Sequence, residues 1–310
     1  MQDRISSNPL DYIMPLNMNK LEGRMMIVPG PKNKQSDILL VPDAISMLER
    51  WWSLADNLAD YATVTVPDLP GIGGMDSFIS IGINPNIDSY ADYLAAFIKL
   101  RFKRKKILIV GYGFGFAITT KMLQKYPELN KKIDFIVAIS GYVHKDDFTY
   151  SRFESFTYHN ITKLLALRPV YFIFKPLLTS FILDKFIKKL VADSSSIYKH
   201  ASKQEKLANQ QFLTRILTVN DLRSNLLIIR EILSIDLCHK RIDVPLINIA
   251  TKQQKSLNSQ VNEEHLQVIY KLYKRYLANN TPEAYSIIAD KKMVGKLLPQ
   301  AFRRILSDLK

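Results

Sequence analysis

A glycine-rich turn at residues 111–115 joins a predicted buried strand to a predicted helix. Residues 107–110 are all apolar, and Ile118 and Met122 beyond the turn fall on one helical face. Enzymes that attack with a serine use a sharp strand-to-helix turn of this kind, G-x-S-x-G, to raise the hydroxyl above a sheet. The central position here is Gly113. The turn is therefore present, and the hydroxyl that would do the chemistry is absent.

The same glycines allow a second interpretation, a turn that binds the pyrophosphate of a dinucleotide. That motif is G-x-G-x-x-G on a first strand, with an acidic residue about 20 positions later. Position 116 is Phe, no such acidic residue is obvious, and the turn lies in the middle of the chain. The nucleophile-type turn is favoured, and no cofactor is expected.

Apolar runs and helical patterns alternate on both sides of this turn, and they stop alternating in one long stretch. The predicted strands are residues 24–28, 38–41, 63–66, 107–110, 135–139, 244–249 and 285–289. The predicted helices are residues 45–60, 90–100, 114–125, 177–191, 222–233, 262–277 and 297–309. Such alternation predicts an α/β fold with a doubly wound, mostly parallel sheet. The predicted organisation is a first core part at 1–141, a helical insertion at 142–240 and a second core part at 241–310.

Several segments together resemble the α/β-hydrolase fold, in the subgroup with a helical lid. The run Pro67-Asp68-Leu69-Pro70-Gly71-Ile72-Gly73 is similar to the D-x-P-G-x-G loop of that family. Further similar segments are the strand at 38–41 followed by Trp51 or Trp52, Lys125-Tyr126-Pro127-Glu128 after the nucleophile helix, Asp243-Val244-Pro245 before a strand, and Pro299 with Phe302 in a final helix. The resemblance covers nearly the whole chain.

The resemblance implies a triad of serine, carboxylate and histidine, and all three positions hold other residues. Gly113 stands at the nucleophile position. Counting from Pro245 places the acid at Gln254, and counting back from Pro299 places the base at Lys292. The last histidine in the chain is His265, so a small error in this alignment cannot restore the base.

The loop that would stabilise an oxyanion is also altered. The family often has His-Gly after its third strand, where this chain has Pro42-Asp43 followed by Ala44. A carboxylate at Asp43 opposes the negative charge of a tetrahedral intermediate, and it leaves Phe114 as the one useful N–H donor. Asp43, Ala44, Tyr112 and Phe114 are predicted to line the old pocket.

A relocated catalytic site is the weaker alternative. Ser140 and His144 follow the strand at 135–139, with Asp146 and Asp147 just beyond. No sharp glycine turn surrounds Ser140, and a lone histidine there is more often a capping or solvated side chain. The remaining histidines lack metal-ligand spacing, and the single cysteine, Cys238, is predicted to be a small buried apolar residue, so no metal is expected.

The net charge of +14 lies mainly in the second half of the chain, +2 over residues 1–140 and +6 over each of 141–240 and 241–310. No nucleic-acid-binding motif accompanies it, so nucleic acid is not an expected partner. The N-terminus does not resemble a secretory signal, and Lys175 and Pro176 interrupt the most apolar stretch, so a cytoplasmic location is expected. The aromatic and cationic run at 168–175 fits either the cover of an apolar pocket, which is favoured, or peripheral membrane contact.

Two functions follow from these observations. The first is a pseudoenzyme of the α/β-hydrolase type that binds an apolar small molecule under its lid, or a protein partner. The second is a hydrolase resembling esterases and lipases, with relocated or unrecognised catalytic residues.

Overall fold

The computed structural model describes residues 6–32, 34, 36–181, 202–251, 256–278, 291–295 and 298–308. Eight strands form one sheet in the order β1-β2-β4-β3-β5-β6-β7-β8. They are β1 (Ile13–Met18), β2 (Leu21–Val28), β3 (Ser36–Val41), β4 (Val64–Pro67), β5 (Lys106–Tyr112), β6 (Ile133–Ile139), β7 (Leu246–Thr251) and β8 (Tyr273–Ala278). The strand β2 pairs antiparallel with both β1 and β4, and the pairs from β4 to β8 are parallel. The predicted doubly wound, mostly parallel sheet is confirmed.

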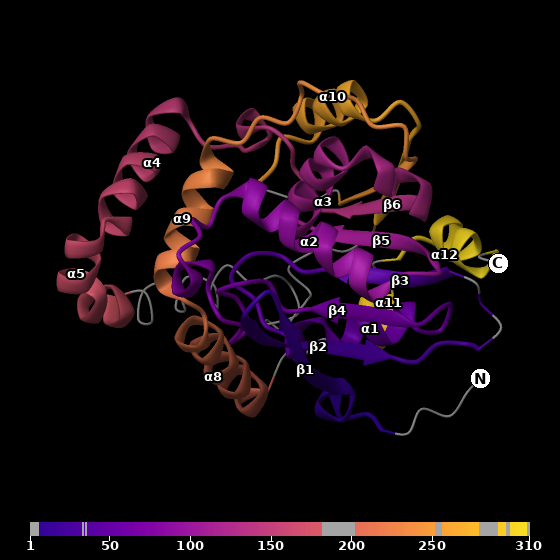
Figure 1. The fold of residues 1–310 in the computed structure, drawn as a ribbon, viewed down its shortest axis with the longest axis horizontal. Coiled ribbons are helices and arrows are strands. Elements are labelled where there is room, and N and C mark those ends of the chain that lie inside the picture. The colour runs from indigo at the N-terminus through magenta and orange to yellow at the C-terminus, as the bar shows by residue number, and fades with distance from the viewer. Residues whose placement is uncertain are drawn as a thin grey trace.

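Helices cover both faces of this sheet (Figure 1). One face carries α2 (Ile87–Arg101), α3 (Phe114–Lys125) and α10 (Ser259–Ile269), and the other carries α1 (Trp52–Leu58), α11 (Lys291–Gly295) and α12 (Gln300–Ser307). Short 3-10 helices occur at Pro9–Tyr12, Leu48–Trp51, Phe78–Ile81, Pro127–Lys132 and Lys145–Asp147.

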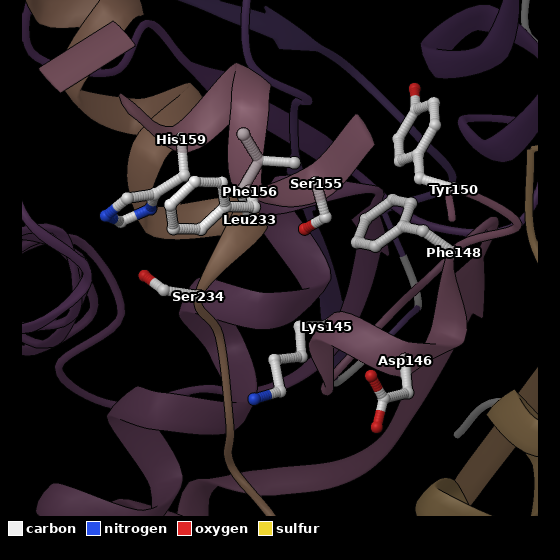
Figure 2. A pocket seen from close by; sticks show the side chains of 9 residues that line it. All are labelled: Lys145, Asp146, Phe148, Tyr150, Ser155, Phe156, His159, Leu233 and Ser234. Carbon is white, nitrogen blue, oxygen red and sulfur yellow. The ribbon is translucent and has the colours of Figure 1, made fainter. Parts of the chain in front are cut away.

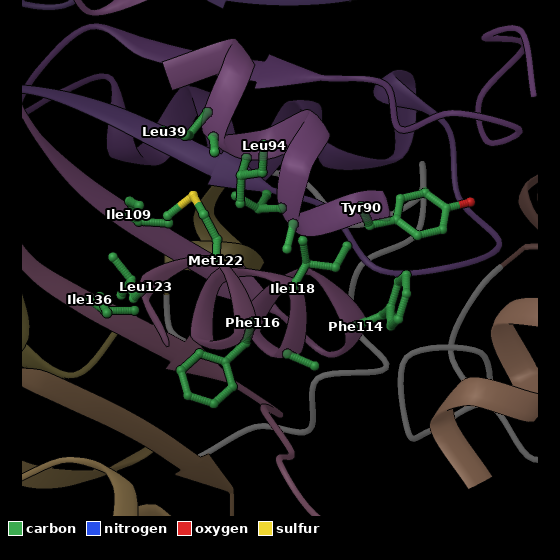
Figure 3. Close-up of a cluster of buried hydrophobic side chains, with 14 of the residues drawn as sticks. Leu39, Tyr90, Leu94, Ile109, Phe114, Phe116, Ile118, Met122, Leu123 and Ile136 are labelled. Atoms are coloured by element: carbon green, nitrogen blue, oxygen red, sulfur yellow. The ribbon is translucent and has the colours of Figure 1, made fainter. Parts of the chain in front are cut away.

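The two faces explain why the central strands are apolar throughout. In β5, Ile107 and Ile109 pack with α2 and α3, whereas Leu108 and Val110 pack with α1 and α12. Successive side chains of a strand point to opposite faces, so a strand covered on both faces has no polar side. Figure 3 shows the apolar core between the sheet and the helices α2 and α3, in which Ile118 of α3 lies among apolar side chains of the sheet and of α2.

Four described α-helices lie between β6 and β7, where the helical insertion is predicted. They are α4 (Arg152–Ala166), α5 (Arg168–Phe181), α8 (Lys203–Val219) and α9 (Leu222–Leu233). In Figure 1, α9 lies between α4 and the helices on the sheet. Among the described residues, no helix combines the length and the apolar character needed to cross a bilayer. The residue boundaries of the three parts remain predictions.

Two predicted elements differ from the structure, and one strand was not predicted. The helix predicted over 262–277 is wrong, because α10 ends at Ile269 and β8 follows at Tyr273–Ala278. Residues 270–278 mix apolar and basic side chains that suit either element, and pairing with β7 selects the strand. The helix predicted at 45–60 begins only at Leu48, and β1 was not predicted at all. The predicted strand at 285–289 lies outside the described residues, as does the helix at 177–191 beyond Phe181.

Candidate functional site

The turn between β5 and α3 has the strained backbone of a nucleophile elbow. Gly113 has φ 49° and ψ −114°, which is a conformation that favours glycine because it lacks a Cβ. Its N–H donates to the carbonyl of Ile139 at 3.1 Å, so β6 holds the turn in place. The chain thus keeps the elbow geometry without a side chain at its tip.

Two backbone N–H groups meet at this elbow, and both donate to one carboxylate oxygen. Phe114 N lies 2.8 Å from Oδ1 of Asp43, and Ala44 N lies 2.9 Å from the same atom. One donor follows the nucleophile position, and the other lies in the loop after β3. These are the two places from which an oxyanion hole of this kind takes its donors. The Asp43 carboxylate therefore occupies the oxyanion hole of its own chain.

The same carboxylate fills the space of the missing nucleophile. A Cβ built on Gly113 would lie 2.6 Å from Cγ and 2.7 Å from Oδ2 of Asp43. Real Cβ atoms do not approach other atoms this closely. A serine at position 113 and the present position of Asp43 therefore exclude one another.

This arrangement corrects the sequence-based interpretation of the loop. The expectation that Phe114 would be the one remaining donor is wrong, because Ala44 supplies a second. An ionised carboxyl group close to the chain needs such donors to replace its lost water. The two N–H groups that would form the hole in a hydrolase of this fold are present, and both donate to the carboxyl group of Asp43.

The surroundings of Asp43 shift the acidity of two groups. Burial raises the pKa of the Asp43 carboxyl above its usual value, and this effect outweighs the N–H donors and the positive charge of Arg50, which lower it. Burial also raises the pKa of the Tyr142 hydroxyl well above its usual value, and the nearby charge of Asp43 adds to that shift.

The other predicted pocket residues serve the core as well as the elbow. The ring of Tyr112 lies edge-on to Trp51 at 5.0 Å, and the ring of Phe114 lies edge-on to Tyr90 at 5.4 Å. The structure therefore brings together Asp43, Ala44 and the backbone of Gly113 and Phe114. Gln254, the predicted acid position, lies outside the described residues, and Lys292, the predicted base position, belongs to α11.

A second polar constellation was not predicted, although both of its residues are named in the sequence argument. Nδ1 of His265 lies 2.6 Å from Oδ1 of Asp147, which is fully buried. The other oxygen of Asp147 accepts from the backbone N–H groups of Val143 and His144, at 2.8 and 3.0 Å, and from Nδ2 of Asn262 at 3.0 Å. With four donors, Asp147 is held as an acceptor, and it orients the imidazole.

This pair fixes the tautomer of His265. An ionised carboxylate can only accept, so Nδ1 carries a proton, and in the neutral imidazole Nε2 keeps a lone pair. No hydrogen bond to Nε2 is present in the described parts of the chain. Sequence reasoning missed the pair because His265 precedes the last strand, and a separation of 118 residues leaves no local signal.

His144 and Ser140 are not joined as a base and a nucleophile in the described residues. Nδ1 of His144 accepts from the N–H of Asp146 at 3.2 Å, so this histidine caps the short helix at Lys145–Asp147. Its ring also lies 4.4 Å from that of His265. Ser140 has φ 52°, and its hydroxyl is buried without a hydrogen-bond partner among the described residues.

Cys238, predicted to be a small buried apolar residue, packs against the apolar core but is only partly buried. Burial, with the nearby charges of Asp236 and Asp147, raises the pKa of its thiol to about 11. Among the described residues, no group of three or more His, Cys, Asp or Glu side chains is placed to hold a metal ion.

A cleft of about 610 Å³ opens between α4, the end of α9 and the segment after β6 (Figure 2). Its apolar lining consists of Phe148, Tyr150, Phe156 and Leu233. Its polar lining consists of Lys145, Asp146, Ser155, His159 and Ser234. Neither Gly113 nor Asp43 lines this cleft. The predicted pocket around the elbow and the open cleft of the described structure are thus different places.

Comparisons with known proteins agree with this fold. Residues 38–166 match the family model of the α/β-hydrolase fold. A hydrolase from Oleispira antarctica has 13% identity and a TM-score of 0.65 over 92% of this chain and 94% of its own. A bacterial membrane phospholipase A has 13% identity and a TM-score of 0.66, over 96% of this chain and 86% of its own. The epoxide hydrolase CorEH has 13% identity and a TM-score of 0.61, over 95% of this chain and 97% of its own.

A search among curated protein sequences found no match. The strand order, the elbow and these likenesses define the class: this is a protein with the α/β-hydrolase fold.

Proposed function

We propose that this α/β-hydrolase-fold protein is non-catalytic at its elbow and acts by binding a ligand or a partner. The observation that carries the proposal is the Asp43 carboxylate, which receives both N–H donors of the oxyanion hole and lies against Gly113. Acyl transfer needs an attacking hydroxyl and an empty hole for the developing anion. Neither is available while Asp43 holds this position.

A ligand of amphipathic character fits the cleft beneath α4. Three aromatic rings and Leu233 supply an apolar wall, and Lys145 adds a cation at the same opening, where Asp146 is the one carboxylate of the lining. Small-molecule sites commonly combine a mainly apolar lining with a few polar groups that fix orientation. The proposed ligand is a small apolar body that carries an acidic group.

Two measurements test the proposal. A fluorophosphonate probe and a panel of short acyl esters should give no labelling and no turnover, because no activated serine is present at the elbow. Stoichiometric labelling, or turnover abolished by Gly113→Ala, would overturn the non-catalytic assignment.

The proposal that the cleft beneath α4 binds a ligand is tested with the fluorescent anion anilinonaphthalene sulfonate. It should bind to the wild-type protein and lose about tenfold in affinity in Lys145→Glu, because the cleft cation becomes an anion. Lys103→Glu, on a distant surface, is the matched control. Equal binding by both variants would exclude this cleft as the site.

A second candidate function is hydrolysis with relocated residues, and the Asp147–His265 pair supports it. A buried carboxylate that holds Nδ1–H leaves Nε2 able to accept a proton, as a general base must. Any ester turnover through this pair should survive Gly113→Ala and disappear in His265→Gln. Turnover that His265→Gln leaves unchanged would exclude the pair as its source.

A further inference from the structure

The helices α4 and α5 expose large apolar side chains along the outer edge of the molecule. Phe153 is 79% exposed, Phe172 is 70% exposed and Ile173 is 73% exposed. In Figure 1 both helices lie at the margin of the fold, with α9 on their inner side. We call the set formed by Phe153, Phe156, Leu164, Leu167, Phe172 and Ile173 the outer face.

The outer face of α4 is a stripe, which distinguishes it from scattered surface residues. Phe153, Phe156 and Leu164 are spaced by three and eight residues, and these spacings share one side of a helix. The opposite side already has its partner, because Thr162 and Ala166 are buried where α4 packs on α9. A surface helix needs one apolar side for its core. The second apolar side of α4 is left without a partner in the described structure.

The charges beside this face are almost all positive. Residues 152–181 contain four basic side chains and a single acidic one, Glu154. Lys163, Arg168 and Lys175 are exposed. Glu154 is engaged in a capping box with Ser151. An apolar face with a cationic border is the composition of helices that lie in the interface of an anionic membrane.

These charges also decide between possible occupants. A second copy of this chain, docked through the same face by two-fold symmetry, would bring like charges together, and the one carboxylate beside each face, Glu154, is already held in its capping box. An anionic lipid surface can contact the apolar side chains and the cations beside them at the same time. Each buried Phe or Ile gains about 1.5–3 kcal/mol, and each Lys or Arg near the surface gains about 1 kcal/mol.

From this combination we infer that the outer face of α4 and α5 docks the protein on anionic phospholipid membranes as a peripheral protein. The aromatic and aliphatic side chains enter the interfacial region, and Lys163, Arg168 and Lys175 contact lipid phosphates. This inference is independent of whether the elbow or the Asp147–His265 pair has any catalytic activity. Phe156 belongs both to the outer face and to the lining of the cleft, so docking would place the cleft beside the lipid.

The test is cosedimentation of the full chain with vesicles. Phosphatidylcholine vesicles are compared with equimolar phosphatidylcholine and phosphatidylserine, at low and high salt. The protein should sediment with the anionic vesicles and release them as salt rises, because screening weakens the cationic contacts. Absence of binding to the anionic vesicles, or equal binding to both kinds, overturns the inference.

Matched pairs of variants locate the contact. Phe153→Asp with Ile173→Asp should lower the partition constant by more than about tenfold, because two inserted side chains become anions. Leu100→Asp with Leu272→Asp changes two apolar residues outside the insertion that are also more than half exposed, and it should retain wild-type binding. Circular dichroism verifies that both pairs are folded.

Two further outcomes would contradict the inference. An equal loss in the two pairs would show that the outer face is not the contact. The second outcome concerns the oligomeric state, which sedimentation velocity measures. If the wild type is a dimer and the Phe153→Asp, Ile173→Asp pair converts it to a monomer, the outer face serves self-association instead.

Discussion

The carboxylate of Asp43 lies where the side chain of residue 113 would begin, so Asp43 and Gly113 depend on each other. Cγ of Asp43 is 2.6 Å from the position of a Cβ on Gly113, and Oδ1 takes both N–H donors of the hole. Glycine gives the carboxylate its space, and the carboxylate satisfies the donors that a substrate would otherwise use. Restoring a serine therefore cannot by itself restore a working elbow.

Gly113→Ser should destabilise the protein by about 1–3 kcal/mol, because the new side chain overlaps Asp43 and inherits the strained backbone. Adding Asp43→Ala should recover part of this loss, and such non-additivity identifies the contact. Urea unfolding of the single and double variants measures both effects. Gly82→Ser is the control, since Gly82 shares a positive φ of 78° and has nothing within 4 Å of its Cβ position. If the changes in the free energy of unfolding simply add in the double variant, a serine at position 113 does not exclude the present position of Asp43.

Asp43→Asn should become more favourable relative to wild type as the pH rises. The folded-state pKa of Asp43 is raised by burial, so the folded protein keeps a proton that the unfolded chain has released above about pH 4. The free energy of unfolding contributed by Asp43 therefore falls as the pH rises through the folded-state pKa. Asparagine does not titrate, so the stability of the variant minus that of the wild type should increase over this range. Urea titrations from pH 4 to about pH 7 measure that difference, and a constant or decreasing value would contradict the shift.

Asp147→Ala should cost about 3 kcal/mol, because it leaves His265 and three further N–H donors around a buried site without their acceptor. Thermal or urea unfolding measures this loss. Asp146→Ala removes the exposed neighbouring carboxylate and should change stability by less than about 0.5 kcal/mol. Similar losses in the two variants would mean that the donors around Asp147 find water instead.

Cys238 should react slowly with alkylating reagents. A thiol with a pKa of about 11 holds roughly a hundredth of the thiolate of an ordinary cysteine near pH 8, and the thiolate is the reactive form. Iodoacetamide labelling, followed by mass spectrometry against free glutathione, should show a rate lower by about two orders of magnitude. A rate equal to that of glutathione would show that the thiol is neither buried nor opposed by the nearby carboxylates.

Local sequence patterns predicted most of the sheet and missed elements that depend on pairing. The apolar runs of β3, β5 and β6 are typical of strands that are covered on both faces of a sheet. By contrast, β8 carries exposed Lys274 and Arg275 at the end of the sheet, and its pattern is also compatible with the end of a helix. Only the ladder with β7 distinguishes the two, and that ladder joins residues about 27 positions apart.

The sequence alone determined the strand, the tight turn and the helix around Gly113, because each is set by neighbours a few residues away. It also showed that a serine is missing there and that no histidine follows His265. Only the tertiary structure shows which polar groups lie together. Asp43 reaches Phe114 across 71 residues, and Asp147 reaches His265 across 118. Contacts at such separations arise from the packing of whole elements, which no local periodicity encodes.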